Sequence, residues 1–242
     1  MKFLPEYWKI YFKNSRTLLY SYLASLPLLL GYEILLFMSQ PSNEQMVRIS
    51  VDVWMQSFIR LMGVNATAVI LLLVAIAGIF ILYREREKFA HLRPVFFVYI
   101  IVESLVYAMV IGAATSTITA ELTMFVSSGI DQLSYLQKLS LSLGAGLYEE
   151  LFFRVILVSA AIYILKKFFR QKWLVNTLAI LSAAVLFSLA HFTGSMGDPF
   201  TLDAFVFRLL FGIALNIIYI WRGFSVAAWT HALYDIFVIT FA

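Results

Sequence analysis

Seven long apolar runs constrain the fold of this chain more than any other feature, at about residues 17–38, 61–83, 95–120, 138–165, 173–194, 204–221 and 223–241. Each is close to the ~20 residues that a helix needs to cross the hydrocarbon core of a bilayer. Apolar residues make up 62% of the 242 residues, and the mean hydropathy is +0.88. Soluble domains contain far less apolar sequence. The pattern therefore predicts an all-α, polytopic transmembrane helix bundle.

The basic residues between the runs predict the orientation of this bundle. Lys and Arg number four before the first run, two in 39–60, four in 84–94, none in 121–137, four in 166–172, none in 195–203 and one at 222. Because cytoplasmic loops carry the excess of basic residues, the N-terminus is expected in the cytoplasm and the C-terminus outside. Residues 1–16 mix lysines with aromatic residues, which predicts an interfacial amphipathic segment. We expect one membrane domain over residues 1–242.

Charge and cysteine content exclude several function classes. The net charge is +4, but the basic residues are spread between the apolar runs and form no single patch, so no nucleic-acid partner is expected. The chain has no cysteine, which excludes a thiol nucleophile, disulfides and thiolate metal sites. The expected partners are the lipid bilayer and a substrate that meets the protein there.

Ionisable residues inside the apolar runs are the main candidates for function. A charge at the centre of a membrane helix costs at least ~2.5–3.5 kcal/mol on insertion scales, so each one is a functional hypothesis. The set comprises Glu33, Glu103, Glu149, Glu150, Arg154, His191, Arg208, His231 and Asp235. No motif surrounds Glu33, Glu103 or Arg208, and we expect structural roles for these three.

Helical spacing separates the remaining charges into pairs. Glu150 and Arg154 are four residues apart with the acid first, which predicts an ion pair on one helix face. Glu149 is rotated by ~100° from Glu150 and has no such partner, so it is expected to take and return a proton.

Two further pairs share this spacing of four residues. His231 and Asp235 lie on one face, which predicts that the acid fixes the orientation of the imidazole. Phe187 and His191 also share a face, with the ring expected to wall the cavity. Counting along the runs places these residues and Glu149 in the outer half of the membrane, where one site could hold them all.

A glutamate base, two histidines and an orienting acid suit a hydrolase that activates water. In a second interpretation, the water is activated by a divalent metal ion that is held by His191, His231 and one or two of the acids Glu149, Glu150 and Asp235. The short paired spacing of a dedicated metal site is missing, so we expect no cofactor, with a divalent metal as the alternative. A third interpretation is a proton relay in a transporter, although neither an internal repeat nor a broken-helix pair is visible.

Other intramembrane proteases fit the sequence poorly. A zinc site of the His-Glu-x-x-His type does not occur in the chain. The nearest string to a serine motif, Gly194-Ser195-Met196-Gly197, has the wrong spacing and falls in a loop. An aspartyl pair would need Tyr-Asp before Gly-x-Gly-Asp, whereas Tyr234-Asp235 comes after Gly197-Asp198.

An ordered set of three motifs resembles a known family. Glu149-Glu150-x-x-x-Arg154, Phe187-x-x-x-His191 and His231-x-x-x-Asp235, on three spans in this order, are similar to the CAAX-protease and bacteriocin-processing family (CPBP, also called Abi). The resemblance covers about residues 138–240, which would hold the catalytic helices.

The resemblance implies a glutamic intramembrane endopeptidase that cleaves a membrane-associated or C-terminal-tail substrate. It implies that Glu149 is the general base, that His191, His231 and Asp235 are catalytic, and that Glu150, Arg154 and Phe187 support them. Relatives often have Asn at the position of Asp235. The looser third motif is partly present at Gly212, Tyr219 and Gly223, with Asn216 in place of a second Gly. The expected location is a bacterial or archaeal plasma membrane, and a non-proteolytic immunity protein is a further alternative.

Overall fold

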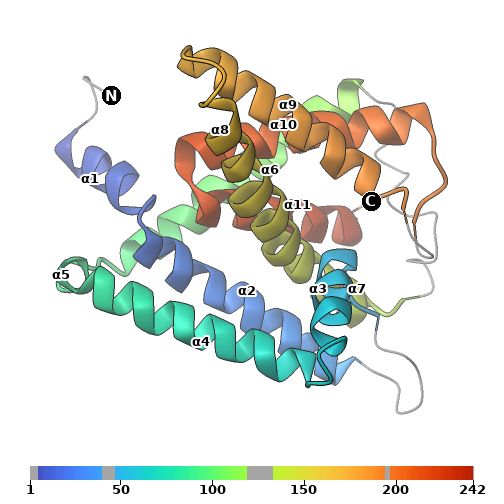
Figure 1. Cartoon of the computed structure of the whole chain (residues 1–242), viewed down its shortest axis with the longest axis horizontal. Helices are drawn as coiled ribbons and strands as arrows, with labels where there is room; N and C mark the ends of the chain where they lie inside the picture. Colours follow the sequence, from blue (N-terminus) through green and yellow to red (C-terminus); the bar gives the residue numbers. More distant parts are fainter. Residues whose placement is uncertain (1–4, 40–46, 119–132, 194–196, 242) are drawn as a thin grey trace.

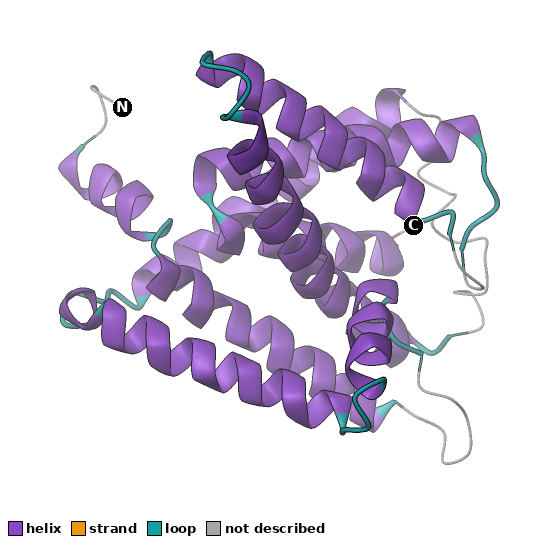
Figure 2. Ribbon diagram, viewed as in Figure 1, coloured by secondary structure: helices purple, strands orange, loops and turns teal. Residues whose placement is uncertain are grey.

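A computed structural model describes residues 5–39, 47–118, 133–193 and 197–241. These residues form helices joined by short loops, with no strand among them (Figure 2). The prediction of an all-α bundle is confirmed. The expected ends of the third run at residue 120 and of the fifth at residue 194 lie outside the described residues, as does part of the loops around them.

The N-terminal half begins with helix α1 (Glu6–Asn14), followed by α2 (Leu18–Met38), α3 (Ser50–Arg60), α4 (Ala66–Arg84) and α5 (Arg86–Phe89). Side-chain caps fix two of these starts, because Thr17 accepts a hydrogen bond from the Tyr20 amide and Asn65 accepts one from the Ala68 amide. Helix α3 lies within the loop that follows the first predicted span, and the apolar runs gave no sign of it.

The remaining described residues form α6 (Val95–Ile118), α7 (Tyr135–Gly144), two π-helical segments η3 (Ala145–Glu149) and η4 (Leu151–Val158), α8 (Ser159–Leu165), α9 (Lys172–Ala190), α10 (Leu202–Arg222) and α11 (Phe224–Phe241). Six helices in the described residues are long and apolar enough to cross a membrane: α2, α4, α6, α9, α10 and α11. The predicted span 138–165 is the fourth apolar segment, and in the structure it extends from Tyr135 to Leu165. It is divided by its π-helical turns and is not one regular α-helix. Which side the N-terminus faces stays a prediction.

Helix α11 lies at the centre of the bundle, against α6, α7, η3 and α10 (Figure 1). Its residues Val226, Ala227, Ala228 and Ala232 are fully buried. Because alanine side chains are short, neighbouring helices can approach the α11 backbone closely. This position allows residues of α11 to meet those of the π-helical segments and of α9.

The turn between α10 and α11 corrects one assumption about topology. Arg222 was counted as a loop cation, but it is fully buried. Its Nε and Nη2 atoms lie 2.5 and 2.8 Å from the two carboxylate oxygens of Glu103 on α6. Gly223 follows with φ of +92°, a conformation that few other residues adopt. Arg222 therefore stabilises the packing of the hairpin and says nothing about the side of the membrane.

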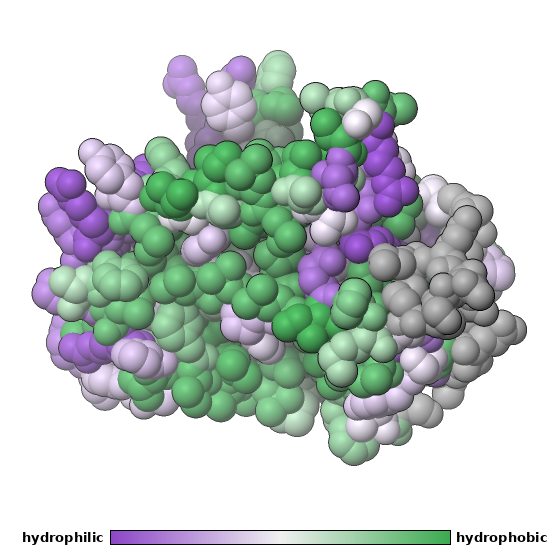
Figure 3. All heavy atoms as spheres, turned by 90° about the horizontal axis from the view of Figure 1, so that it is seen from below, coloured by the Kyte–Doolittle hydropathy of each residue, from purple (hydrophilic) through white to green (hydrophobic). Residues whose placement is uncertain are grey.

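The outer surface is largely apolar. Figure 3 shows hydrophobic residues over the middle of one face, with hydrophilic residues gathered toward its ends. Helix α4 illustrates this, since Leu72, Ile76, Ile79 and Phe80 are each more than half exposed. A soluble protein rarely exposes so large an apolar surface. Together with the six apolar helices, this surface identifies an integral membrane protein.

Candidate active site

The two adjacent glutamates lie in the π-helical part of the fourth apolar segment. Glu149 ends η3 and Glu150 connects it to η4. Both are buried, with 8% and 0% of their surface exposed. A π-helix has a wider turn than an α-helix and is frequent at functional sites. Here both carboxylates face the interior of the bundle, Glu149 toward α9 and Glu150 toward α11.

Gly146 allows helix α11 to reach these carboxylates. A Cβ atom at this position would lie 2.5 Å from the Ala228 carbonyl oxygen and 2.9 Å from the Ala232 amide nitrogen. Both are backbone atoms of α11, so no side-chain movement could relieve the contact. At Gly144, a Cβ atom would instead meet the side-chain ring of Tyr32 on α2.

Replacing Gly146 with alanine is expected to push α11 away from the glutamates. Overpacking of this kind costs about 1–3 kcal/mol, and the shift would also lengthen the contact between Glu150 and His231. We expect a lower melting temperature together with lost activity. Gly31→Ala is the matched control, because its Cβ would meet only the Leu143 Cδ1 atom, at 2.7 Å, at the end of a flexible side chain. Equal effects of the two substitutions would contradict this explanation.

The imidazole of His231 is held by Glu150. Its Nδ1 atom lies 2.7 Å from Glu150 Oε1, and both side chains are buried. Asp235, which was predicted to orient this ring, lies on its other side, with Oδ2 3.6 Å from Nε2. That separation is too long for a hydrogen bond. The acid that orients the His231 ring is therefore Glu150, between η3 and η4, and not Asp235, which is on α11 with His231. Packing of the helices brings Glu150 closer to the ring than Asp235, although Asp235 is only four residues away in sequence.

Arg154 lies beside Glu150 as the spacing predicted, with Nε 2.9 Å from Oε2 and both side chains fully buried. The two atoms are close, but their directions do not match those of a hydrogen bond, and none of the Arg154 nitrogens has such a partner among the described residues. The guanidinium carbon lies 4.4 Å from the centre of the Phe187 ring. Arg154 is thus held by charge and by a cation–π contact.

Phe187 is at the centre of the cluster. Its ring centre lies 4.8 Å from that of His191 and 6.1 Å from that of His231. The same ring also contacts the Arg154 guanidinium, so Phe187 touches three members of the cluster. The sequence predicted Phe187 as a wall of the site, and its position fits that description.

His191 caps the C-terminal end of α9 and is the most exposed member of the cluster, with 22% of its side chain accessible. Its Nδ1 atom lies 2.8 Å from the Phe187 carbonyl oxygen. A carbonyl oxygen only accepts, so Nδ1 carries a proton and donates it. Nε2 then faces Glu149, whose Oε2 atom is 3.8 Å away. Glu149 Oε2 has no hydrogen-bond partner among the described residues.

The structure thus brings all seven predicted site residues into one cluster: Glu149, Glu150, Arg154, Phe187, His191, His231 and Asp235. Sequence reasoning missed Phe211 of α10, whose ring centre lies 5.3 Å from that of His231. One aromatic residue among 22 phenylalanines gives no signal in a single sequence. Asn216, singled out as a departure from the third motif, donates a 2.9 Å hydrogen bond to the Ile180 carbonyl and joins α10 to α9.

The other intramembrane charges lie in separate pairs. Glu33 contacts Arg48, and Glu103 contacts Arg222. Arg208 pairs with Asp198, and its guanidinium also lies 5.1 Å from the Phe192 ring centre. Within the described ranges, no group of three or more His, Asp or Glu side chains is arranged to hold a metal ion.

Comparison with known proteins places this cluster in a family. Residues 131–237 match the family model described as Rce1-like, type II CAAX prenyl endopeptidase. No curated protein and no solved structure matches the chain. The matched segment contains every residue of the cluster, and the match supports a CAAX-type intramembrane endopeptidase. Residues 131–237 therefore belong to the CAAX-protease and bacteriocin-processing family.

Proposed function

We propose that this protein hydrolyses a peptide bond of a membrane-associated or C-terminal-tail substrate, using a water molecule activated by Glu149. The observation that carries the proposal is the convergence of Glu149 with His191 on one side and of Glu150 with His231 on the other. A base for the water and a donor for the developing oxyanion are the two groups that peptide hydrolysis needs.

In this mechanism the Glu149 carboxylate takes a proton from water, and the resulting hydroxide attacks the carbonyl carbon of the scissile bond. His191 presents Nε2 beside Glu149 and accepts a hydrogen bond from the same water, which orients it. Glu149 then gives the proton to the leaving amine as the C–N bond breaks. The products are a carboxylic acid and an amine, and Glu149 regains its charge.

The negative charge that forms on the carbonyl oxygen requires a donor. His231 in its protonated form donates from Nε2, while Nδ1 donates to Glu150. Asp235 lies 3.6 Å from Nε2 and compensates the charge of the imidazolium without occupying the donor by a hydrogen bond. Glu150 and Arg154 position the ring and do not touch the substrate.

The substrate is best found by comparing membrane proteins in two cell lines. We expect cells that carry Glu149→Gln to accumulate an uncleaved precursor that wild-type cells process, detectable by mass spectrometry of protein termini. If the two cell lines have identical termini throughout the membrane proteome, the chain is not an endopeptidase under those conditions of growth and the proposed function fails.

A metal-free mechanism makes a separate prediction. Proteolysis by purified protein is expected to continue at its full rate after incubation with EDTA or 1,10-phenanthroline, because the proposed water is activated by a carboxylate. Metal analysis of the same sample should find less than one equivalent of any transition metal. Loss of activity with chelator, restored by zinc or another divalent ion, would favour the metal-dependent alternative.

A further inference from the structure

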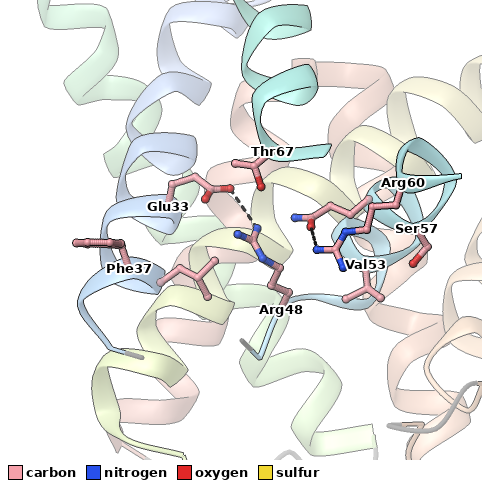
Figure 4. A pocket seen from close by; sticks show the side chains of 9 residues that line it. Glu33, Phe37, Arg48, Val53, Ser57, Arg60 and Thr67 are labelled. Carbon is pink, nitrogen blue, oxygen red and sulfur yellow. Dashed lines mark hydrogen bonds and ion pairs between the residues drawn. The ribbon is translucent and has the colours of Figure 1, made fainter. Parts of the chain in front are cut away.

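A cavity of about 700 Å³ lies between α2, α3 and α4, and no residue of the catalytic cluster lines it (Figure 4). Its lining is partly apolar, with Leu36 and Phe37 on α2, and partly charged, with Glu33, Arg48 and Arg60. This volume is within the usual range for small-molecule sites. The charged residues fall outside the three motifs, so the proposed proteolysis does not explain them.

Two arginines face this cavity from the two ends of α3. Figure 4 shows Arg48 and Arg60 pointing toward the same space, with Glu33 and Thr67 on its other side. Arg48 is held in place, because its Nη1 atom lies 2.8 Å from Asp52 Oδ2 and 3.3 Å from Glu33 Oε1.

Arg60 is held more loosely than Arg48. Its Nη2 atom donates to Gln56 Oε1 over 2.9 Å, and Gln56 is its only hydrogen-bond partner within the described ranges. Since a guanidinium carries five N–H donors, most of those of Arg60 are available to a ligand.

Hydrogen bonds on the buried side of α3 hold the polar lining of the cavity in place. Asp52 is fully buried and accepts hydrogen bonds from the Tyr32 hydroxyl at 2.7 Å and from Gln56 at 3.0 Å. Gln56 in turn positions Arg60. A network that reaches into the core therefore orients Arg48 directly and the exposed Arg60 through Gln56. The N-terminal end of α4, where Thr67 lies, adds its positive dipole to the same space.

The exposed side of α3 indicates the depth of the cavity in the membrane. Phe58 of α3 is 71% exposed, and Leu61 and Met62, which directly follow the helix, are 85% and 72% exposed. This is expected for an amphipathic segment that lies in the interface between head groups and acyl chains. Phe37, at the apolar wall of the cavity, is 81% exposed. An interfacial position of α3 would put the charged lining level with lipid head groups and let the apolar wall continue into the hydrocarbon.

We propose that this cavity binds the head group of an aminophospholipid such as phosphatidylethanolamine. The phosphate lies against the guanidiniums of Arg60 and Arg48, because the planar fork of arginine matches two phosphate oxygens. The ammonium group lies against Glu33, whose side chain is 23% exposed at the cavity. The acyl chains follow the apolar surface past Phe37. A peptide carboxylate would satisfy the arginines but would leave Glu33 facing a negative charge.

Native mass spectrometry of the purified full chain, titrated with phosphatidylethanolamine, phosphatidylcholine or phosphatidylglycerol, tests this proposal. We expect one phosphatidylethanolamine to bind preferentially and Arg60→Gln to weaken its binding by about ten-fold, the effect of one charge-assisted contact. Glu33→Gln should remove the preference for phosphatidylethanolamine over phosphatidylglycerol. Arg84→Gln, at the opposite end of α4, is the matched control and should bind as the wild type does.

Ser57→Phe supplies a second variant, since it fills the cavity without removing a charge, and it should also release the lipid. Equal phosphatidylethanolamine binding by the wild type, Arg60→Gln and Ser57→Phe would overturn the proposal. So would binding of a peptide with a free C-terminal carboxylate that depends on Arg60 while no lipid is retained. These readouts require no proteolysis, so they do not depend on the proposed function.

Discussion

Glu149→Gln is expected to abolish proteolysis, with a fall in kcat of at least about 10²-fold, the lower range for loss of a general base. Glutamine has nearly the same shape but cannot take a proton from water. Glu149 Oε2 has no hydrogen-bond partner among the described residues, so the substitution should leave the melting temperature almost unchanged. Product formation by purified variants in detergent or in nanodiscs, together with their thermal unfolding, is the measurement.

Glu87→Gln provides the control for loss of one carboxylate, because Glu87 lies exposed on α5, outside the cluster. It should cleave the substrate at the wild-type rate. Glu150→Gln should be distinguishable from both, since Glu150 holds His231 and Arg154 and its loss alters stability as well as rate. A Glu149→Gln variant that retains full activity on a genuine substrate would disprove Glu149 as the base.

Arg154→Met is expected to have the largest effect on stability, lowering the free energy of unfolding by about 3–5 kcal/mol, as found when one partner of a buried ion pair is removed. The cause is Glu150, which would be left as a fully buried carboxylate with its charge compensated only by His231. Thermal or denaturant unfolding in a fixed detergent measures the change. Lys9→Met removes the exposed pair with Glu6 and should cost less than about 1 kcal/mol.

The double variant Glu150→Leu/Arg154→Met separates stability from catalysis. Replacing both members of a buried pair by apolar residues is often neutral for stability, so unfolding should return close to that of the wild type. Activity should not return, because His231 Nδ1 would have lost its acceptor. A double variant that is both stable and fully active would show that Glu150 has no part in positioning His231.

The sequence predicted the helices well because the signals for membrane spans are local. The length of an apolar run and the spacing of residues four apart depend only on the neighbouring chain. Arg154 beside Glu150 and Phe187 beside His191 are of this kind, and the structure has both contacts.

The contacts between helices could not be predicted in the same way. The hydrogen bond from His231 to Glu150 joins residues 81 positions apart and depends on how α11 packs against Gly146. The π-helical turns were missed because a pattern of 3.6 residues per turn cannot show where the backbone changes to a wider turn. Helix α3 was missed since it is short and amphipathic, and Arg222 was placed in a loop because only its distant partner Glu103 reveals its burial.

The pairing of Glu103 with Arg222 has a consequence for the order in which the protein assembles. Translation produces α6 long before α10, so Glu103 enters the bilayer while its arginine does not yet exist. During that interval Tyr11 and Tyr107, whose hydroxyls lie 2.5 and 2.9 Å from its carboxylate oxygens, are already synthesised and can donate to it. Arg222 then arrives with the last hairpin and neutralises the charge. The charge of Glu103 is thus neutralised only after α10 has been synthesised, immediately before α11, the helix that carries His231.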